Sequence, residues 1–286
     1  MSEAKKYQKA LITGASAGLG LEYARQLAEV GTNLILVARR KERLEKLAAE
    51  LRDKYGIKAE VLAADLSREE NIEQLVQKIK QTEDLDLLIN NAGFGGFGQF
   101  YADEKGQYEQ MIMVHVIATV RLTRAALPGM IKRKRGAVIN VSSVAAFSPL
   151  SGSMYSSTKA FLVMFSENLQ TELQGTGVKV QALCPGLTHT EFHEVAGFNK
   201  EATPKFMWMT AERVVSISLR ALKGKKVIVI PGVLNKFLTF LMRCPLTYGL
   251  VRWAARRETI RKKAGLAKFK EKEGTMGSTG RALRSQ

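Results

Sequence analysis

Tyr155 and Lys159 are the residues of this chain whose types and spacing most directly suggest chemistry, in the segment Tyr-Ser-Ser-Thr-Lys. Residues four apart on a helix share one face, so the phenol and the ammonium group can point at one spot. A phenol normally titrates near pH ~10, and a nearby fixed cation favours the phenolate. The pair therefore predicts acid–base chemistry near neutral pH. Both residue types are common, however, and a solvated helix face would show the same spacing.

A glycine-rich turn near the N-terminus indicates which ligand that pair would serve. Residues 9–13 form a short apolar run that ends at Gly14-Ala-Ser-Ala-Gly18-Leu-Gly20, and a helical pattern of apolar residues follows. A strand, a glycine-rich turn and a helix are typical of a dinucleotide site, because the glycines let the pyrophosphate approach the backbone at the helix N-terminus. The spacing Gly-x3-Gly-x-Gly differs from the more general Gly-x-Gly-x2-Gly. This difference restricts the dinucleotide-binding families to which the chain can belong.

The next apolar run, residues 33–38, leads into Arg39 and Arg40. A site that prefers NAD would carry Asp or Glu here to bind the ribose 2′-hydroxyl, whereas two arginines suit a 2′-phosphate. The alternative is that both belong to the start of the helix expected over residues 41–55, but a helix N-terminus is the unfavourable end for cations. We therefore expect NADP(H) to be preferred over NAD(H).

Short apolar runs alternate with helical patterns along most of the chain, which predicts a parallel sheet covered by helices on both faces. Further strands are expected over residues 59–66, 86–93, 137–143, 178–186 and 226–232. Helices are expected over residues 71–80 and 106–130, and a further helix carries Tyr155. No stretch reaches the ~18 uninterrupted apolar residues of a membrane-spanning helix.

Composition limits the classes of protein to which the chain can belong. Its 286 residues, 45% of them hydrophobic, fit one large α/β domain or one domain with an appendage. Cys184 and Cys244 lie far apart without a Cys-x2-Cys pattern, which argues against a disulfide framework or a zinc site and suits a reducing compartment. The first residues contain no apolar run that could act as a signal peptide. We therefore expect a cytoplasmic protein.

The C-terminal part of the chain is amphipathic and then strongly basic. The net charge is +17, and residues 251–286 alone carry 11 Lys or Arg against three Glu. Before them, apolar side chains recur at the spacing of one helical stripe: Leu234, Phe237, Leu238, Leu241 and Met242. Polar residues fall on the other side of that helix: Asn235, Lys236, Thr239 and Arg243. A basic tail behind an apolar segment indicates an anionic membrane surface rather than nucleic acid.

We divide the chain into a domain over residues 1–232, an amphipathic extension over 233–255 and a basic tail over 256–286. We expect the protein to attach reversibly and peripherally to a membrane. We do not expect it to bind nucleic acid. The stripe could instead close a substrate pocket or form a dimer contact, and the tail could be a solvated segment that only aids solubility.

Five motifs in this order resemble those of the single-domain short-chain dehydrogenase/reductase family, over about residues 9–232. They are Thr13-Gly14-x3-Gly18-x-Gly20, Asn90-Asn91-Ala-Gly93, Ser142-Ser143 at a strand end, Tyr155-x3-Lys159 and Pro185-Gly186-x3-Thr190. Each motif is weak alone, but five in register are strong. The resemblance implies a doubly wound, Rossmann-type α/β fold with seven parallel strands in the order 3-2-1-4-5-6-7. It also implies NAD(P)-dependent interconversion of a carbonyl and an alcohol, for which the two arginines predict NADP(H), and we expect a homodimer or homotetramer.

The same resemblance assigns roles to residues. Tyr155 would donate a proton to the carbonyl oxygen or remove one from the alcohol, and Lys159 would lower the pKa of Tyr155 and bind the nicotinamide ribose. A serine at the end of the fifth strand would hydrogen-bond the substrate oxygen. The strand register indicates Ser143, whereas counting back from Tyr155 indicates Ser142, and we choose Ser143. The residues expected to bind the cofactor are Gly14, Ser16, Gly18, Leu19, Gly20, Arg39, Arg40, Asp65, Leu66, Asn91, Tyr155, Lys159, Pro185, Gly186, Thr188 and Thr190.

One position departs from the family pattern. The family usually carries Asn in the long helix, where it anchors a water of the proton relay, and this chain has His115. Imidazole can hold a water or relay protons near neutral pH, so we include His115 among the catalytic residues. The alternative is a histidine tolerated for packing, with slower catalysis.

The loops expected to border the pocket are rich in aromatic residues, which predicts an apolar substrate such as a lipid-like or steroid-like carbonyl. They are Phe94, Phe97, Phe100, Phe192, Phe198, Phe206 and Trp208. His189 and His193, with Glu191 and Glu194, invite a metal interpretation, but hydride transfer to a nicotinamide needs no metal and none is expected.

Two other classes of function remain open. One is a protein that keeps NADP(H) as a structural or sensing ligand with weakened catalysis, against which the intact Tyr155 and Lys159 argue. The other is a sugar-nucleotide epimerase or dehydratase of the extended family, against which the glycine spacing and the short C-terminal region argue.

Overall fold

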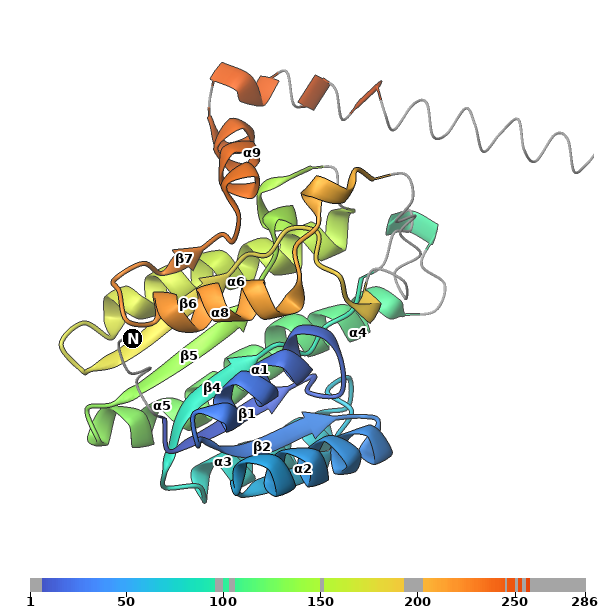
Figure 1. The fold of residues 1–286 in the computed structure, drawn as a ribbon. Coiled ribbons are helices and arrows are strands. Elements are labelled where there is room, and N and C mark those ends of the chain that lie inside the picture. The colour runs from blue at the N-terminus through green and yellow to red at the C-terminus, as the bar shows by residue number, and fades with distance from the viewer. Residues whose placement is uncertain are drawn as a thin grey trace, which may run out of the picture. The chain divides into compact units, whose positions relative to one another are not determined.

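The computed structural model describes residues 7–95, 100–102, 106–149, 152–192, 203–244, 246–249, 252–253 and 256–257. Seven parallel strands form one sheet in the order β3-β2-β1-β4-β5-β6-β7 (Figure 1). The predicted fold class and strand order are thereby confirmed. The strands are β1 Lys9–Thr13, β2 Asn33–Ala38, β3 Ala59–Ala63, β4 Leu85–Asn90, β5 Gly136–Val141, β6 Val178–Leu183 and β7 Ile228–Val229.

Helices cover both faces of this sheet (Figure 1). One face is packed by α1 (Gly18–Glu29), α2 (Lys41–Tyr55) and α8 (Ala211–Ala221). The opposite face is packed by α3 (Glu69–Lys80), α5 (Ala118–Lys132) and α6 (Ser153–Glu172). Helix α4 (Gln107–Ile112) leads into α5, and α9 (Val233–Arg243) follows β7.

Alternation along the buried strands builds the two cores. In β1, Ala10 and Ile12 belong to the core under α1 and α2, whereas Leu11 belongs to the core under α3 and α5, because successive strand side chains point to opposite faces. All three are fully buried. A strand buried on both faces is apolar at successive positions, which explains the continuous apolar run in the sequence. The parallel arrangement also brings the carboxyl ends of the strands, and the turns that follow them, to one edge of the sheet.

The long helix predicted over residues 106–130 is interrupted by a π-helical turn, Met113–Ile117, with His115 at its centre. Turns of this kind are rare in proteins overall, but where they occur they often lie at functional sites. The span Gln107–Lys132 is long and apolar enough to cross a membrane by length and composition alone. However, Leu122 and Met130 are fully buried in the core beside the sheet, as expected of a core helix.

The chain forms two compact units, Met1–Thr239 and Phe240–Gln286, and the predicted division of the chain at residues 232 and 255 stays a prediction. In the first unit two polar residues of α9, Asn235 and Thr239, face inward, whereas Lys236 is exposed. Thr239 is 3% exposed, and Asn235 donates to the carbonyl oxygen of Pro231 at 2.8 Å. Phe237 is 57% exposed, because the apolar stripe faces away from that contact.

Candidate active site

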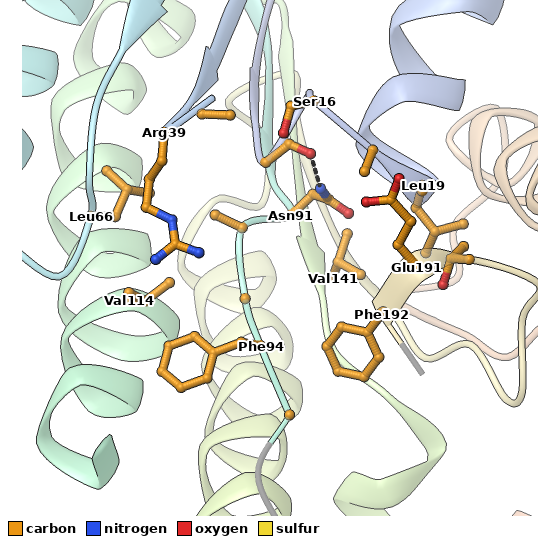
Figure 2. A pocket seen from close by; sticks show the side chains of 18 of the residues that line it. Ser16, Leu19, Arg39, Leu66, Asn91, Phe94, Val114, Val141, Glu191 and Phe192 are labelled. Carbon is orange, nitrogen blue, oxygen red and sulfur yellow. Dashed lines mark hydrogen bonds between the residues drawn. The ribbon is translucent and has the colours of Figure 1, made fainter. Parts of the chain in front are cut away.

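A cavity of about 390 Å³ opens at the carboxyl ends of the strands, where doubly wound sheets bind their ligands. The glycine-rich turn after β1 and the exit of β2 line one end, and the start of α6 lines the other. Figure 2 shows side chains from these turns converging on it, with Ser16 and Arg39 toward one end and Phe94 and Phe192 toward the other.

The first turn of α1 can receive an anion. Gly14 and Gly18, which line the cavity, have φ angles of +69° and +57°, a conformation that side chains other than glycine rarely adopt. The N-terminus of α1 has no side-chain cap and no acidic residue in its first turn. Its backbone N–H groups therefore suit the pyrophosphate of a dinucleotide, and the fold and the residues present fit that ligand.

The two arginines at the exit of β2 reach different parts of the cavity. Figure 2 shows the guanidinium of Arg39 entering on the side of Leu66. Arg40 turns to the glycine-rich turn, where its Nε and Nη2 donate to Ser16 Oγ at 3.2 and 3.1 Å. A guanidinium beside a hydroxyl is a donor set that binds phosphate well, so this corner fits the 2′-phosphate of NADP(H).

Asn91 and Asp65 order the turns that border the cavity. Asn91 Nδ2 donates to the carbonyl oxygens of Thr13 at 2.9 Å and Gly14 at 3.3 Å (Figure 2). Asp65 accepts from the N–H and the hydroxyl of Ser67 at 3.0 and 2.8 Å. Burial alone would raise the pKa of Asp65, but these hydrogen bonds and the nearby positive charges bring it below its ordinary value. Both residues therefore stabilise the turns that border the cavity, whether or not they also contact a ligand.

Tyr155 and Ser143 meet at the other end of the cavity. The side chain of Ser143 lies close enough to the phenol of Tyr155 to lower its pKa, and Ser143 Oγ accepts from the N–H of Ala145 at 3.1 Å. Ser142 instead donates to the carbonyl oxygen of Lys159 at 2.7 Å. The structure thus places Ser143, the serine chosen from the strand register, beside the phenol.

The electrostatics of Tyr155 and Lys159 differ from the expectation. Burial raises the pKa of Tyr155 to about 12, against a smaller opposing effect of the Ser143 side chain. Burial also lowers the pKa of Lys159 to about 8. Lys159 Nζ donates to the carbonyl oxygen of Val141 at 2.8 Å and lies 5.7 Å from the centroid of the Tyr155 ring. The expectation that Lys159 brings the phenol toward neutral pH is therefore wrong for the protein alone, in which the phenol is protonated at pH 7.

His115 has both ring nitrogens engaged. Nε2 accepts from the N–H of Phe94 at 3.1 Å, and Nδ1 lies 3.0 Å from Thr158 Oγ1. Because Nε2 accepts, Nδ1 carries the proton and donates to Thr158. Thr158 Oγ1 in turn donates to the carbonyl oxygen of Tyr155 at 3.0 Å, so a chain of hydrogen bonds ties the turn after β4 to the start of α6.

The same ring is neutral and lies outside the cavity lining. Burial, with the charge of Lys159, holds the pKa of His115 well below 6.5. A Cβ on Gly93 would lie 2.8 Å from His115 Nε2, so this turn packs directly on the imidazole. A role of His115 in proton relay stays a prediction, and the contacts present are those of a positioning residue.

Most of the predicted site residues line this one cavity: Gly14, Ser16, Gly18, Leu19, Arg39, Arg40, Asp65, Leu66, Asn91, Ser143, Tyr155, Lys159, Pro185, Gly186, Thr188 and Thr190. Gly20 does not line it. A Cβ on Gly20 would collide with the carbonyl oxygen of Gly14, so Gly20 permits the close packing of the turn instead.

The aromatic residues predicted around the pocket divide into two groups. Phe94 and Phe192 line the cavity and pack against Tyr155. Phe100, Phe206 and Trp208 do not line it, contrary to the prediction, because the first two are exposed and Trp208 stacks on His189 with ring centroids 5.1 Å apart. Phe97 and Phe198 lie outside the described residues, as do His193 and Glu194 of the metal pattern. Within the described part of the chain, no group of three or more His, Cys, Asp or Glu is arranged to hold a metal.

Glu191 and Arg43 are site residues that sequence reasoning missed, since Glu191 was considered only as a neighbour of possible metal ligands. The Glu191 carboxylate lines the cavity and accepts from Arg40 Nη1 at 3.0 Å and from Arg43 Nη1 at 2.8 and 3.0 Å. Arg43 stands three residues after Arg40, a spacing that places neighbours on one helix face. That spacing was the available signal, but nothing in the sequence indicates that Glu191 reaches both.

Comparison with known proteins identifies the family. Residues 8–200 match the family described as short chain dehydrogenase. The chain belongs to this family. The structure is similar to that of a short-chain dehydrogenase from Sphingobium yanoikuyae in complex with NADPH, with a TM-score of 0.75 and 32% identity over 90% of this chain and 95% of that one.

Two relatives named by sequence are also oxidoreductases. The chain is 39% identical over 189 residues to the NADP-dependent 3-hydroxy acid dehydrogenase YdfG of Salmonella typhi, which covers 65% of this chain and 75% of that protein. It is 31% identical over 192 residues to the very-long-chain 3-oxoacyl-CoA reductase of Anas platyrhynchos, which covers 65% of this chain and 62% of that protein. The match thus spans less than two thirds of the latter. Dehydrogenases and reductases are the class of enzyme to which the family match assigns this chain.

Proposed function

We propose that the protein is an NADP(H)-dependent oxidoreductase that interconverts a carbonyl and an alcohol on an apolar substrate, with Tyr155 as the proton donor or acceptor. One observation carries this proposal. A single cavity joins the arginines after β2 to Tyr155 and Ser143, which lie beside each other. A dinucleotide with a 2′-phosphate has its extra charge at one end and its reactive ring at the other, and so uses both ends of the cavity.

When bound, NADP(H) supplies or accepts the hydride, and the residues of the chain handle the substrate oxygen and its proton. Ser143 and Tyr155 both line the cavity beside each other, and their two hydroxyl groups can together hold that oxygen. Because the pKa of Tyr155 is raised to about 12, the phenol keeps its proton and can donate it to a carbonyl oxygen. Lys159, with a pKa of about 8, carries a positive charge beside the phenol at pH 7.

The apolar substrate is supported by the surroundings of Tyr155. The side chains that pack with it are Met111, Ala145, Phe94, Met154 and Phe192. An apolar group bound there would remove these side chains from water, which favours binding by about 25 cal/mol per Å² of apolar surface. One relative is named for a very-long-chain 3-oxoacyl-CoA substrate, in agreement with a lipid-like carbonyl.

The second candidate, an NADP(H)-binding protein with weakened catalysis, is favoured by one observation. Both ring nitrogens of His115 are engaged by protein groups, so the ring is not arranged to anchor a relay water as the family's Asn does. Measured turnover separates the two functions.

The test is a screen of aldehydes, ketones and alcohols with NADPH or NADP⁺, together with Tyr155→Phe. We expect turnover of at least one apolar carbonyl, its loss in Tyr155→Phe, and nearly unchanged NADPH affinity. Tyr23→Phe is the matched control, because Tyr23 is buried and bonds Ser218 at 2.6 Å rather than lining the cavity. NADPH binding without turnover of any compound would support the binding protein, and a Tyr155→Phe variant that keeps most of its rate would remove Tyr155 as the acid.

We also propose that the protein is cytoplasmic and attaches to an anionic membrane surface through the segment that begins at α9. Apolar side chains there are exposed to water: Val233 at 82%, Phe237 at 57%, Phe240 at 65% and Leu246 at 90%. Arg252 lies over the ring of Tyr248 at 5.9 Å, and Arg257 lies over that of Trp253 at 4.1 Å. Aromatic rings with adjacent cations suit the headgroup region, where each Lys or Arg contributes about 1 kcal/mol.

Co-sedimentation with liposomes, with and without anionic lipid, tests this attachment. We expect binding to the anionic liposomes that weakens as salt rises, because the attraction is screened over ~8 Å at physiological ionic strength. Charge reversal of the basic residues should release the protein: Arg256, Arg257, Arg261, Lys262 and Lys263. If the protein stays in the supernatant at low salt, the exposed stripe has another occupant, and sedimentation equilibrium then tests the expected homodimer or homotetramer.

A further inference from the structure

Glu191 lines the cavity, where Figure 2 shows its carboxylate beside Leu19, and it pairs with Arg40, one of the two arginines expected to bind the 2′-phosphate. Its two carboxylate oxygens are shared between Arg40 Nη1 at 3.0 Å and Arg43 Nη1 at 2.8 and 3.0 Å. These hydrogen bonds hold the pKa of Glu191 below its ordinary value, so the group is ionised at neutral pH.

The guanidinium of Arg40 is thereby divided between two partners. Nε and Nη2 bind Ser16 Oγ, and Nη1 binds Glu191. A phosphate monoester carries a charge of about −1.5 to −2 at pH 7 and seeks the same guanidinium and hydroxyl donors. A carboxylate and a phosphate on one guanidinium repel each other, so a 2′-phosphate that reaches Arg40 must displace Glu191 or bind more weakly.

The residue after Glu191 touches the catalytic end of the cavity. The ring of Phe192 lies 5.9 Å from that of Tyr155, centroid to centroid, and packs against the cluster of Tyr155, Met111 and Ala145. Two consecutive residues thus contact the two ends of one site. Because the two residues are consecutive, a displacement of the Glu191 backbone would also move Phe192.

We propose that Glu191 is an internal substitute for the 2′-phosphate, which NADP(H) displaces and NAD(H) does not, and that this displacement moves Phe192 away from Tyr155. The inference rests on the proposed use of NADP(H). Glu191 then acts as a specificity-determining residue: it lowers the affinity for phosphorylated cofactors below what the arginines alone would give, and it links the arrival of the cofactor to access at the phenol.

Calorimetric binding of NADPH, NADH and 2′,5′-ADP to the full chain tests the first part. Glu191→Gln removes the charge and keeps the size of the side chain. We expect it to bind NADPH and 2′,5′-ADP three- to tenfold more tightly than the wild type, with NADH unchanged. Glu50→Gln is the matched control, since Glu50 is equally exposed and pairs with Arg25 at 3.3 Å outside the cavity lining.

The fluorescence of Phe192→Trp tests the second part. We expect 2′,5′-ADP to shift the emission of the introduced tryptophan and 5′-ADP to leave it unchanged. In the variant that also carries Glu191→Gln, the emission should be close to the shifted position before any ligand is added. Equal responses to both nucleotides would overturn the link to Phe192.

The outcomes distinguish this inference from the function on which it rests. If the wild type binds NADPH no more tightly than NADH, the proposed cofactor preference fails. If the wild type prefers NADPH but Glu191→Gln and Glu50→Gln have equal affinities, the preference stands and the role of Glu191 is refuted.

Discussion

Lys159 should control how the reduction rate depends on pH. Its ammonium is 4% exposed, and burial lowers its pKa to about 8. Roughly nine tenths of the molecules then carry the charge at pH 7 and roughly one tenth at pH 9. Because Tyr155 has a pKa of about 12, the phenol stays protonated throughout. We expect kcat/KM for NADPH-driven reduction to fall about tenfold between pH 7 and pH 9, together with NADPH affinity.

The groups around Lys159 allow the assignment to be checked. Cys184 is buried and interacts electrostatically with Lys159, and an unperturbed thiol titrates near pH ~8.5, so Cys184→Ala must keep the fall in rate if Lys159 causes it. His115 titrates well below 6.5 and does not contribute in this range. Lys159→Arg should remove the fall, whatever its absolute rate, because a guanidinium stays charged above pH ~12.

The free energy of unfolding should rise with pH over the range in which the reduction rate falls. A loss of rate caused by titration of Lys159 can therefore be told apart from one caused by denaturation. The folded-state pKa of Lys159 is about 8 and its ordinary value is 10.5. Between these values the unfolded chain binds more protons, so stability rises with pH, by up to about 3 kcal/mol for a shift of this size. Urea unfolding of the wild type and Lys159→Met at pH 7 and pH 10 measures the difference. A rate that is flat from pH 7 to pH 10, or a fall that survives Lys159→Arg, would refute this reasoning.

Three further predictions concern single contacts. Replacing Arg39 and Arg40 by Gln should weaken NADPH about 10- to 100-fold and NADH less than about twofold, because a charge-assisted phosphate contact contributes about 1.5–3 kcal/mol; equal losses for both cofactors would contradict it. Ser143→Ala should lower kcat by roughly 100-fold, the usual effect of losing one donor to the reacting oxygen, whereas Ser142→Ala should mainly lower the free energy of unfolding by about 1 kcal/mol. His115→Ala should lower the free energy of unfolding, measured in urea, by about 2–4 kcal/mol, because two groups lose their hydrogen-bond partner and a cavity is left. An unchanged stability would show that the imidazole does not stabilise the turn.

The parts of the fold that depend on local pattern were predictable from the sequence. The helix over Lys41–Tyr55 and the strand over Lys9–Thr13 have the predicted bounds, because apolar periodicity and turn residues determine where such elements begin and end. The sheet order followed from the family resemblance. The motifs at the strand ends also met in one cavity, since parallel strands bring those ends to one edge of the sheet.

The parts that depend on contacts distant in sequence were not predictable. The pairing of Glu191 with Arg40 joins residues 151 positions apart, and no periodic pattern records it. The sequence also left open which side of α9 faces inward, and the hydrogen bond of Asn235 and the burial of Thr239 show that these two polar residues do. Burial could not be predicted from the spacing of Tyr155 and Lys159 either, and it is the largest influence on the pKa of Tyr155, which it raises.

The two shifted pKa values have one consequence for the direction of the reaction. A phenol with a pKa of about 12 is a ready acid and a poor base at pH 7. Oxidation of an alcohol needs the phenolate, which burial disfavours, whereas reduction of a carbonyl uses the phenol in the form that burial maintains. The lowered pKa of Lys159 acts in the same sense, because any loss of its positive charge makes the phenolate still less favourable. In the protein without its cofactor the phenol is therefore held in the form that reduction uses, and positive charge added beside Tyr155 would favour the phenolate that oxidation uses.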